Sequence, residues 1–236
     1  MDALLADNIS FGYKNQRIFD NASLQVKVGE IIGIVGPNGS GKTTFFDLIC
    51  GLRESETGIL RTASQHSYLS QTVYTPPALR MSDIFRMTVA LTSTHKLTCD
   101  RVSEKLAQWS PGIKERFGQI YQKKSSICSY GEKRWFFALL LLAMERELVV
   151  LDEPTAGVDP EFRFYIWQCI MGAAKEGAAV LVSSHHIDEI AEHCDRFYVI
   201  NHRKFVGFGD GDEFKRHFSA DSLDQAFIRA SASLVT

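Results

Sequence analysis

The sequence contains no run of apolar residues long enough to cross a bilayer. Its longest candidate runs from Trp135 to Met144, well short of the roughly 20 residues that a spanning helix needs. The first residues, Met1 to Asp7, are acidic and lack the extended apolar segment of a signal peptide. We therefore expect no membrane-spanning helix in this chain, so that any work at a membrane requires a partner that supplies the spanning helices.

Charge of one sign is not in excess either. The chain has 26 lysine and arginine residues against 28 aspartate and glutamate residues, which gives a formal net charge of −2. This balance argues against a generally basic nucleic-acid-binding protein. We expect no nucleic-acid partner.

Cysteine is scarce, and its spacing matches no known framework. The five residues form no C-x-x-C pair: Cys50, Cys99, Cys128, Cys169 and Cys194. An odd, scattered set of this kind is typical of reduced thiols in a cytoplasmic protein.

Apolar sequence is plentiful enough for a sizeable core, at 45% of 236 residues. This length suits one α/β domain with an inserted subdomain, or two small domains.

Residues 4–28 read as strands joined by a polar turn at 14–16, which predicts an antiparallel sheet ahead of the segments described next. Residues 72 to about 127 show helical spacing over 78–91 and 101–109, which predicts a mostly helical insertion. Further helices are expected from 129 to about 145 and over 161–175.

The most informative segment is a glycine-rich turn between a short apolar run, 31–35, and a helical pattern. It has the form G-x-x-x-x-G-K-T and consists of Gly36, Pro37, Asn38, Gly39, Ser40, Gly41, Lys42, Thr43 and Thr44. A backbone of this kind can aim successive N–H groups at one phosphate, with Lys42 on the β- and γ-phosphates and the Thr43 hydroxyl on Mg²⁺. A turn without a ligand is the alternative, but Lys42 and Thr43 directly after the glycine favour a nucleoside triphosphate site.

A second apolar run, 148–151, ends in two carboxylates, Asp152 and Glu153. Four apolar residues are too few for a helix and are typical of a buried strand, whose carboxyl end lies at the ligand-binding edge of an open α/β sheet. Asp152 is then in reach of the Mg²⁺ beside Thr43, and Glu153 is free to activate a water molecule. The alternative, that both residues cap the next segment, is weakened by the glycine-rich phosphate-binding turn upstream, residues 36–44, which we call the P-loop.

A third buried strand, 179–184, leads into His185. We expect this histidine to contact the γ-phosphate or the attacking water, with a helix cap as the alternative. A metal cluster of His185, His186, His193 and Cys194 is disfavoured, because it needs convergent geometry.

Earlier in the chain, either Phe11 or Tyr13 fits the core by local pattern, although an exposed ring there could stack on a purine.

These sequence motifs, taken in the order in which they occur, resemble those of the nucleotide-binding subunits of ATP-binding cassette (ABC) transporters. The discriminating segment is 128–134, which is similar to that family's L-S-G-G-Q signature followed by basic residues. Ser129 and Gly131 are kept, whereas Cys128, Tyr130 and Glu132 stand where the family has Leu, Gly and Gln. The resemblance covers essentially residues 4–209.

Carried over by position, the resemblance implies a role for each matching residue. Tyr13 corresponds to the aromatic that stacks on adenine, and Gln71 to the glutamine that touches Mg²⁺ and relays to the membrane partner. Glu153 corresponds to the general base and His185 to the switch histidine. Asp159 corresponds to the aspartate of the family's D-loop. Ser129, Gly131 and Glu132 would contact ATP as part of the signature.

The family architecture implies a P-loop NTPase core with an antiparallel β subdomain and an inserted α-helical subdomain. It implies one ABC ATP-binding domain over 1–236, with the nucleotide core at 1–71 and 146–211, the helical and signature subdomain at 72–145, and a short tail at 212–236. Two cassettes, identical or different, would close around ATP and drive a transmembrane permease from the cytoplasmic face of the membrane. The segment 221–228 resembles a part of export-type cassettes and favours export slightly.

Two other functions stay open from the sequence. A soluble cassette ATPase that acts on DNA or on the ribosome would share the same motifs, although the coiled-coil arms, zinc modules or second cassette that such proteins carry do not occur here. A regulatory cassette that binds ATP with little hydrolysis is favoured by Tyr130 and disfavoured by Glu153 and His185.

Overall fold

The computed structural model describes residues 2–14, 16–92 and 97–232. Its first layer is an antiparallel sheet with the strand order β2-β1-β4. The strands are β1 (Asp2–Tyr13), β2 (Gln16–Lys27) and β4 (Thr57–Thr62). The predicted sheet ahead of the P-loop therefore contains β1 and β2, and a third strand from beyond the P-loop pairs with β1. Of the predicted turn at 14–16, Asn15 lies outside the described residues.

The second sheet has six strands in the order β5-β6-β7-β3-β8-β9. They are β3 (Ile31–Val35), β5 (His66–Leu69), β6 (Leu148–Asp152), β7 (Ala179–Ser184), β8 (Arg196–Asn201) and β9 (Lys204–Phe208). All neighbours run parallel except β9, which is antiparallel to β8. Every residue of β3, β6 and β7 is buried, and burial on both faces explains their continuous apolar sequences. The carboxyl ends of these three strands share one edge of the sheet.

Helix α1 (Lys42–Ile49) lies between the two sheets. Its Phe45 and Phe46 are fully buried and pack in one cluster with residues of both sheets, among them Leu4 of β1 and Ile32 of β3. The P-loop, which precedes α1, is thereby fixed between a strand and a helix that are both packed in the core.

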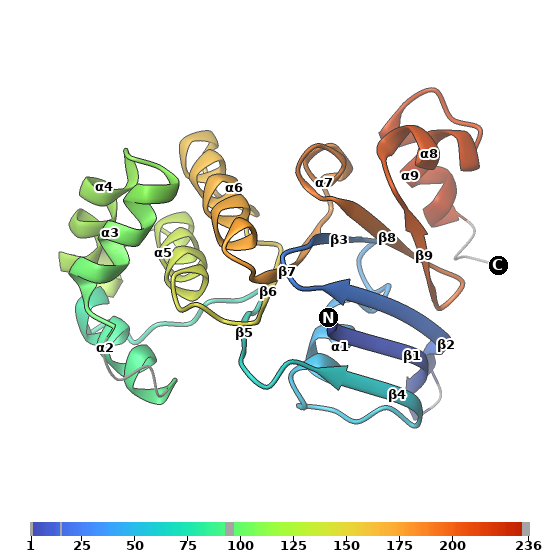
Figure 1. Cartoon of the computed structure of the whole chain (residues 1–236), viewed down its shortest axis with the longest axis horizontal. Coiled ribbons are helices and arrows are strands. Elements are labelled where there is room, and N and C mark those ends of the chain that lie inside the picture. The colour runs from blue at the N-terminus through green and yellow to red at the C-terminus, as the bar shows by residue number, and fades with distance from the viewer. Residues whose placement is uncertain (1, 15, 93–96, 233–236) are drawn as a thin grey trace.

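Four helices between β5 and β6 form one side of the molecule, at the left of Figure 1. They are α2 (Met81–Leu91), α3 (Cys99–Trp109), α4 (Ile113–Gln122) and α5 (Tyr130–Leu142), with a 3₁₀ turn at Ser125–Ile127 before α5. Helix α6 (Pro160–Lys175) lies beside α5. The three tryptophans, Trp109, Trp135 and Trp167, are on α3, α5 and α6. The ring of Trp135 stacks on Phe162 with the centroids 4.6 Å apart, which joins α5 to α6.

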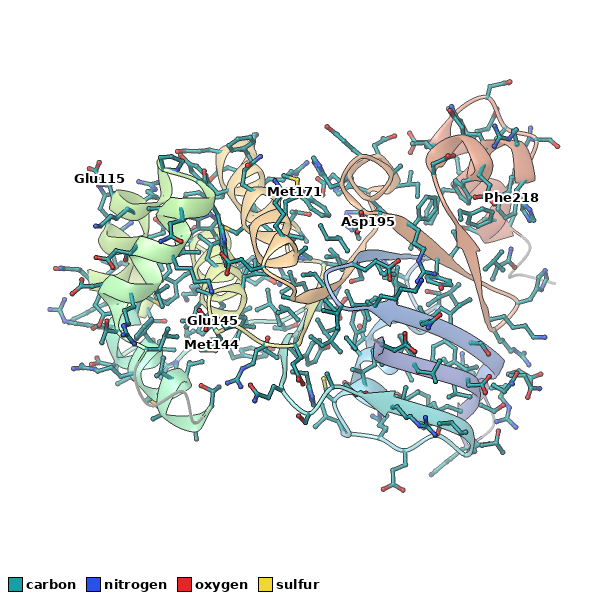
Figure 2. All side chains as sticks on the ribbon, in the orientation of Figure 1. Glu115, Met144, Glu145, Met171, Asp195 and Phe218 are labelled. Atoms are coloured by element: carbon teal, nitrogen blue, oxygen red, sulfur yellow. The ribbon has the colours of Figure 1, made fainter. Side chains whose placement is uncertain are left out.

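The last helices in the described part of the chain are α7 (Ile187–His193), before β8, and α8 (Gly211–His217) and α9 (Leu223–Ala232), after β9. Between α7 and β8, the carboxylate of Asp195 accepts a hydrogen bond from the backbone N–H of Ile31 at 2.8 Å, which ties this loop to the start of β3 (Figure 2). In the part of the chain that the structure describes, no helix has the length and apolar character needed to cross a membrane.

Several helix boundaries differ from the sequence prediction. Helix α2 begins at Met81 rather than near residue 78, because Arg80 is extended and bridges to Lys124. Helix α5 ends at Leu142 rather than near 145, and Glu145 has a left-handed backbone with φ 54°. Helices α4 and α7 were not predicted as separate elements.

Candidate functional site

The P-loop curls around the ammonium group of Lys42. Two glycines have the left-handed backbone that favours a residue without Cβ, Gly39 with φ 80° and Gly41 with φ 110°. Lys42 Nζ donates to the carbonyl oxygen of Gly36 at 2.7 Å and lies 3.4 Å from that of Pro37. Burial lowers the pKa of Lys42, which Glu153 and Asp152 oppose by favouring the charged form.

Asp152, at the end of β6, is held by two hydroxyl groups. Thr43 Oγ1 of α1 donates to Oδ2 at 2.8 Å, and Ser183 Oγ of β7 donates to Oδ1 at 2.6 Å. The parallel register of β6 and β7 pairs Asp152 with Ser183 directly. Burial raises the pKa of Asp152, and the two hydrogen bonds offset that rise only in part.

Glu153 lies where four chain segments meet. Its Oε1 is 4.0 Å from Lys42 Nζ, and its Oε2 is 3.5 Å from both Gln71 Nε2 and His185 Nδ1. Only 7% of Glu153 is exposed. Its backbone has φ 51°, a strained value for a residue with a Cβ, and its N–H donates to Ser183 Oγ at 2.9 Å. A carboxylate is thus aimed at the P-loop from the ligand-binding edge of the sheet.

An open cavity of about 380 Å³ lies over these groups. Its lining is Asn38, Gly39, Gly41, Lys42, Thr43, Thr44, Gln71 and Glu153. Its lining offers hydrogen-bond donors, namely an ammonium group, backbone N–H groups and hydroxyls, together with carboxylate and amide oxygens as acceptors. Such a set suits a phosphate chain, and the hydroxyl, carboxylate and amide oxygens of Thr43, Asp152 and Gln71 are ligand types that Mg²⁺ accepts.

Tyr13 lies beside this cavity, at the end of β1. Its hydroxyl is 3.4 Å from Thr44 Oγ1, and the Arg53 guanidinium lies over its ring, 4.8 Å from the centroid. The ring is 38% exposed, whereas Phe11 is buried. The structure therefore separates the two aromatics that the sequence left as alternatives. Adenine stacking by Tyr13 remains a prediction.

The signature residues lie at the start of α5 and serve that helix. Ser129 caps it: Ser129 Oγ accepts from the N–H of Glu132 at 3.0 Å, and Glu132 Oε2 accepts from the N–H of Ser129 at 2.9 Å. The carboxylate of Glu132 also pairs with Lys123 at 2.7 Å. A Cβ on Gly131 would lie only 2.9 Å from the carbonyl oxygen of Gly157. Close packing of α5 on the loop after Glu153 thus requires glycine at 131.

Not all predicted site residues converge in one chain. Within the described residues, Ser129, Gly131, Glu132 and Asp159 make no hydrogen bond or ion pair with Lys42 or Glu153. Asp159 instead caps α6, with its Oδ1 accepting from the N–H of Phe162 at 2.9 Å. Of the histidines, His185 faces Glu153, whereas His193 packs on Trp167.

Two further residues shape the site and were not singled out from the sequence. Ser183 was read only as part of a strand, although two serines, Ser183 and Ser184, at the end of an otherwise apolar strand are themselves a signal. Arg134 is fully buried behind Asp152 and Glu153 and donates to their carbonyl oxygens. Nothing in the local sequence distinguishes Arg134, which is buried, from the neighbouring Lys133, which is partly exposed.

Comparison with known proteins decides the family. A protein-family model described as "ABC transporter" matches residues 19–156, more than half of the chain. The chain belongs to the ABC transporter family. A second model, described as "AAA domain, putative AbiEii toxin, Type IV TA system", matches residues 123–191.

Individual relatives match along most of their length. The chain is 30% identical over 216 residues to Protein McbF of Escherichia coli, covering 88% of this chain and 86% of that protein. It is 28% identical over 226 residues to the lipopolysaccharide export system ATP-binding protein LptB of Haemophilus influenzae, covering 90% and 92%. It is 26% identical over 200 residues to the zinc import ATP-binding protein ZnuC of Anaplasma marginale, covering 84% and 79%.

Solved structures agree on the fold. One titled "Structure of ATP binding subunit of ABC transporter" matches with a TM-score of 0.82 at 22% identity, covering 97% of this chain and 99% of that one. The predicted P-loop NTPase fold of the ABC type is therefore confirmed. As an ATP-binding subunit of this family, the chain is an ATPase.

Proposed function

We propose that this ABC subunit binds ATP and Mg²⁺ in the cavity beside the P-loop and hydrolyses ATP with Glu153 as the general base. The observation that carries the proposal is the convergence of Lys42, Gln71 and His185 on the Glu153 carboxylate. A general base must lie within reach of the proton it takes, directly or through one water molecule. Glu153 satisfies this requirement for a water placed between its carboxylate and the P-loop.

Each neighbouring group has a defined task in this proposal. Lys42 and the P-loop N–H groups bind the β- and γ-phosphates. Thr43, Asp152 and Gln71 would hold Mg²⁺, which neutralises charge on the phosphate oxygens when bound. His185, with its ring beside Glu153, would orient the water or the γ-phosphate, and Tyr13 would stack on adenine.

The site is completed by a second cassette in this proposal. Ser129 and the first turn of α5 make no polar contact with Lys42 or Glu153 of their own chain among the described residues, which supports a role toward the site of a partner cassette. A helix N-terminus with a serine hydroxyl suits a γ-phosphate held by the opposite subunit. ATP would then join the pair, and hydrolysis would release it.

The cassette would act on a separate transmembrane permease at the cytoplasmic face of the membrane. Support comes from LptB and ZnuC, whose names assign them to an export and an import system. Because these relatives differ in direction, export rests only on the resemblance of residues 221–228. Among the alternatives, a nucleic-acid-linked cassette ATPase predicts salt-sensitive binding to DNA or RNA.

The test uses Glu153→Gln, which keeps the shape of the side chain but removes its basicity. We expect retained ATP binding and a turnover reduced by roughly 10²- to 10⁴-fold. Size-exclusion chromatography of this variant with ATP and Mg²⁺ should show a shift from monomer to dimer that is absent without ATP. Turnover at the parental rate would contradict the assignment of the base, and no shift despite measured ATP binding would contradict closure of two identical chains.

A further inference from the structure

The guanidinium of Arg134 connects the segments that carry the proposed catalytic groups. Arg134 is fully buried on α5. Its Nε donates to the carbonyl oxygen of Glu153 at 2.7 Å, its Nη2 donates to that of Asp152, and its Nη1 donates to that of Gln71 at 2.6 Å. These three carbonyl groups belong to the residues that bear the two carboxylates and the amide of the site.

A buried cation normally pairs with a carboxylate, because desolvation of an unpaired charge is costly. The hydrogen-bond partners of Arg134 are instead uncharged oxygen atoms. Its planar fork of donors matches several acceptors at fixed angles, which lysine cannot do. One of these acceptors belongs to Glu153, the residue with the strained φ of 51°. The guanidinium thus helps to hold the backbone conformation that aims the Glu153 carboxylate.

Tyr130, one helical turn before Arg134, completes the connection. Its hydroxyl donates to the carbonyl oxygen of Gln71 at 2.8 Å and accepts from Arg134 Nη1 at 2.8 Å. A Cβ added to Gly157 would lie 3.5 Å from Tyr130 Cδ1, so the ring lies close to the loop that follows β6. The bulky side chain that replaces the family's glycine is 45% exposed, and its hydroxyl is directed at the segment that follows β5 in its own chain.

We propose that Tyr130 and Arg134 form a clasp that fixes Gln71 and Glu153 to the signature helix α5 of the same chain, and that both are positioning residues for hydrolysis. The clasp rests on the proposed function of Glu153. Its consequence is that the start of α5 is tied to the backbone that carries the Glu153 carboxylate. When the start of α5 contacts the ATP of a partner cassette, this contact then affects the position of Glu153, the general base of its own chain.

The test separates kcat from KM in the full chain. Arg134→Lys keeps the charge but loses the fork, and we expect kcat to fall at least tenfold with the KM for ATP changed less than threefold, because Lys42 and Thr43 are untouched. Tyr130→Phe removes one hydroxyl, and we expect kcat to fall roughly threefold to tenfold, the range of one hydrogen bond. The double variant should lose less than the product of the two factors, because Tyr130 and Arg134 share a hydrogen bond.

Tyr74→Phe is the matched control, since Tyr74 is 89% exposed, and its kcat should equal the parental value. Circular dichroism checks that each variant is folded. If Arg134→Lys does not fold, Tyr130→Phe decides, because it removes a single oxygen atom.

Two outcomes tell the clasp apart from the proposed function. The clasp would be overturned if kcat stayed at the parental value in Tyr130→Phe and in any folded Arg134→Lys protein while Glu153→Gln was slow in the same assay. The proposed function would then still stand. Parental turnover of Glu153→Gln would instead overturn the assignment of the base.

Discussion

At the scale of single residues, Lys42 has an informative set of partners. Its ammonium group donates to P-loop carbonyl oxygens and lies 4.0 Å from the Glu153 carboxylate, with little exposure to water. A buried ammonium group held this loosely to its nearest carboxylate can exchange its present contacts for a phosphate anion. Binding of ATP would then replace hydrogen bonds to uncharged carbonyl oxygens with hydrogen bonds to phosphate anions.

Substitution of Lys42 tests this directly. Lys42→Ala should weaken ATP affinity by roughly 10- to 100-fold, the range expected for loss of a hydrogen bond to a charged group. Titration with a fluorescent ATP analogue measures the change. Lys114→Ala, on the exposed surface of α4, is the control and should bind as the parent does. Unchanged affinity in Lys42→Ala would show that the P-loop is not the ATP site.

The residues of the site differed in how far the sequence could predict them. Lys42, Thr43, Asp152 and Glu153 were readable because each occupies a fixed place after a buried strand. Arg134 was not, because its role depends on burial against carbonyl groups from two distant loops. Local sequence carries no information about such a contact.

At the scale of elements, two glycines inside helices differ in their surroundings. A Cβ added to Gly118 in α4 would meet no atom of the described residues within 4 Å, whereas a Cβ on Gly172 in α6 would lie 2.3 Å from the Trp109 ring. The first is a weak point of its helix, and the second is the site where α3 packs against α6.

The same substitution should therefore have opposite effects at these two positions. Gly118→Ala should stabilise the protein by about 0.5–1 kcal/mol, because alanine loses less backbone entropy in a helix. Gly172→Ala should destabilise it by about 1–3 kcal/mol through overpacking against Trp109. Urea unfolding of both variants measures the two changes. If Gly172→Ala were more stable than the parent, the prediction of overpacking would be wrong, because Trp109 of α3 would have moved aside without loss of stability.

Element boundaries were less predictable than element types. The buried strands β3, β6 and β7 were expected from their apolar runs and were confirmed. The predicted start of α2 was wrong, because Arg80, the residue before the helix, is extended and bridges to Lys124. Long-range pairing of this kind overrides local helical spacing.

At the scale of the whole molecule, Arg196 of the second sheet forms an ion pair with Glu30, between β2 and β3, and also contacts the first sheet. Arg196 of β8 donates through Nε to Glu30 Oε1 at 2.6 Å and through Nη2 to the carbonyl oxygen of Gln25 in β2 at 2.8 Å. Burial raises the pKa of Glu30, but the hydrogen bonds from Arg196 and from the Lys27 N–H outweigh it, so that the pKa lies below its ordinary value of 4.5.

This ion pair predicts an acid-dependent loss of stability. Because the pKa of Glu30 is lower in the folded state than in the unfolded chain, its contribution is fully present above pH 4.5 and is lost as pH falls through the folded-state pKa. Urea unfolding should show Glu30→Gln less stable than the parent at pH 7, with the gap narrowing below pH 4.5. Glu104→Gln, exposed on α3, should show no such gap. A gap independent of pH would contradict the role of the carboxylate charge.

The placement of the tryptophans has a practical consequence. All three lie on α3, α5 and α6, and none lies in either sheet. Intrinsic tryptophan fluorescence therefore reports on α3, α5, α6 and their packing partners, which include His193 of α7, while far-ultraviolet circular dichroism reports on the secondary structure of the whole molecule. Emission from Trp135, five residues after Tyr130 in α5, gives movements of that helix an optical signal without an attached dye.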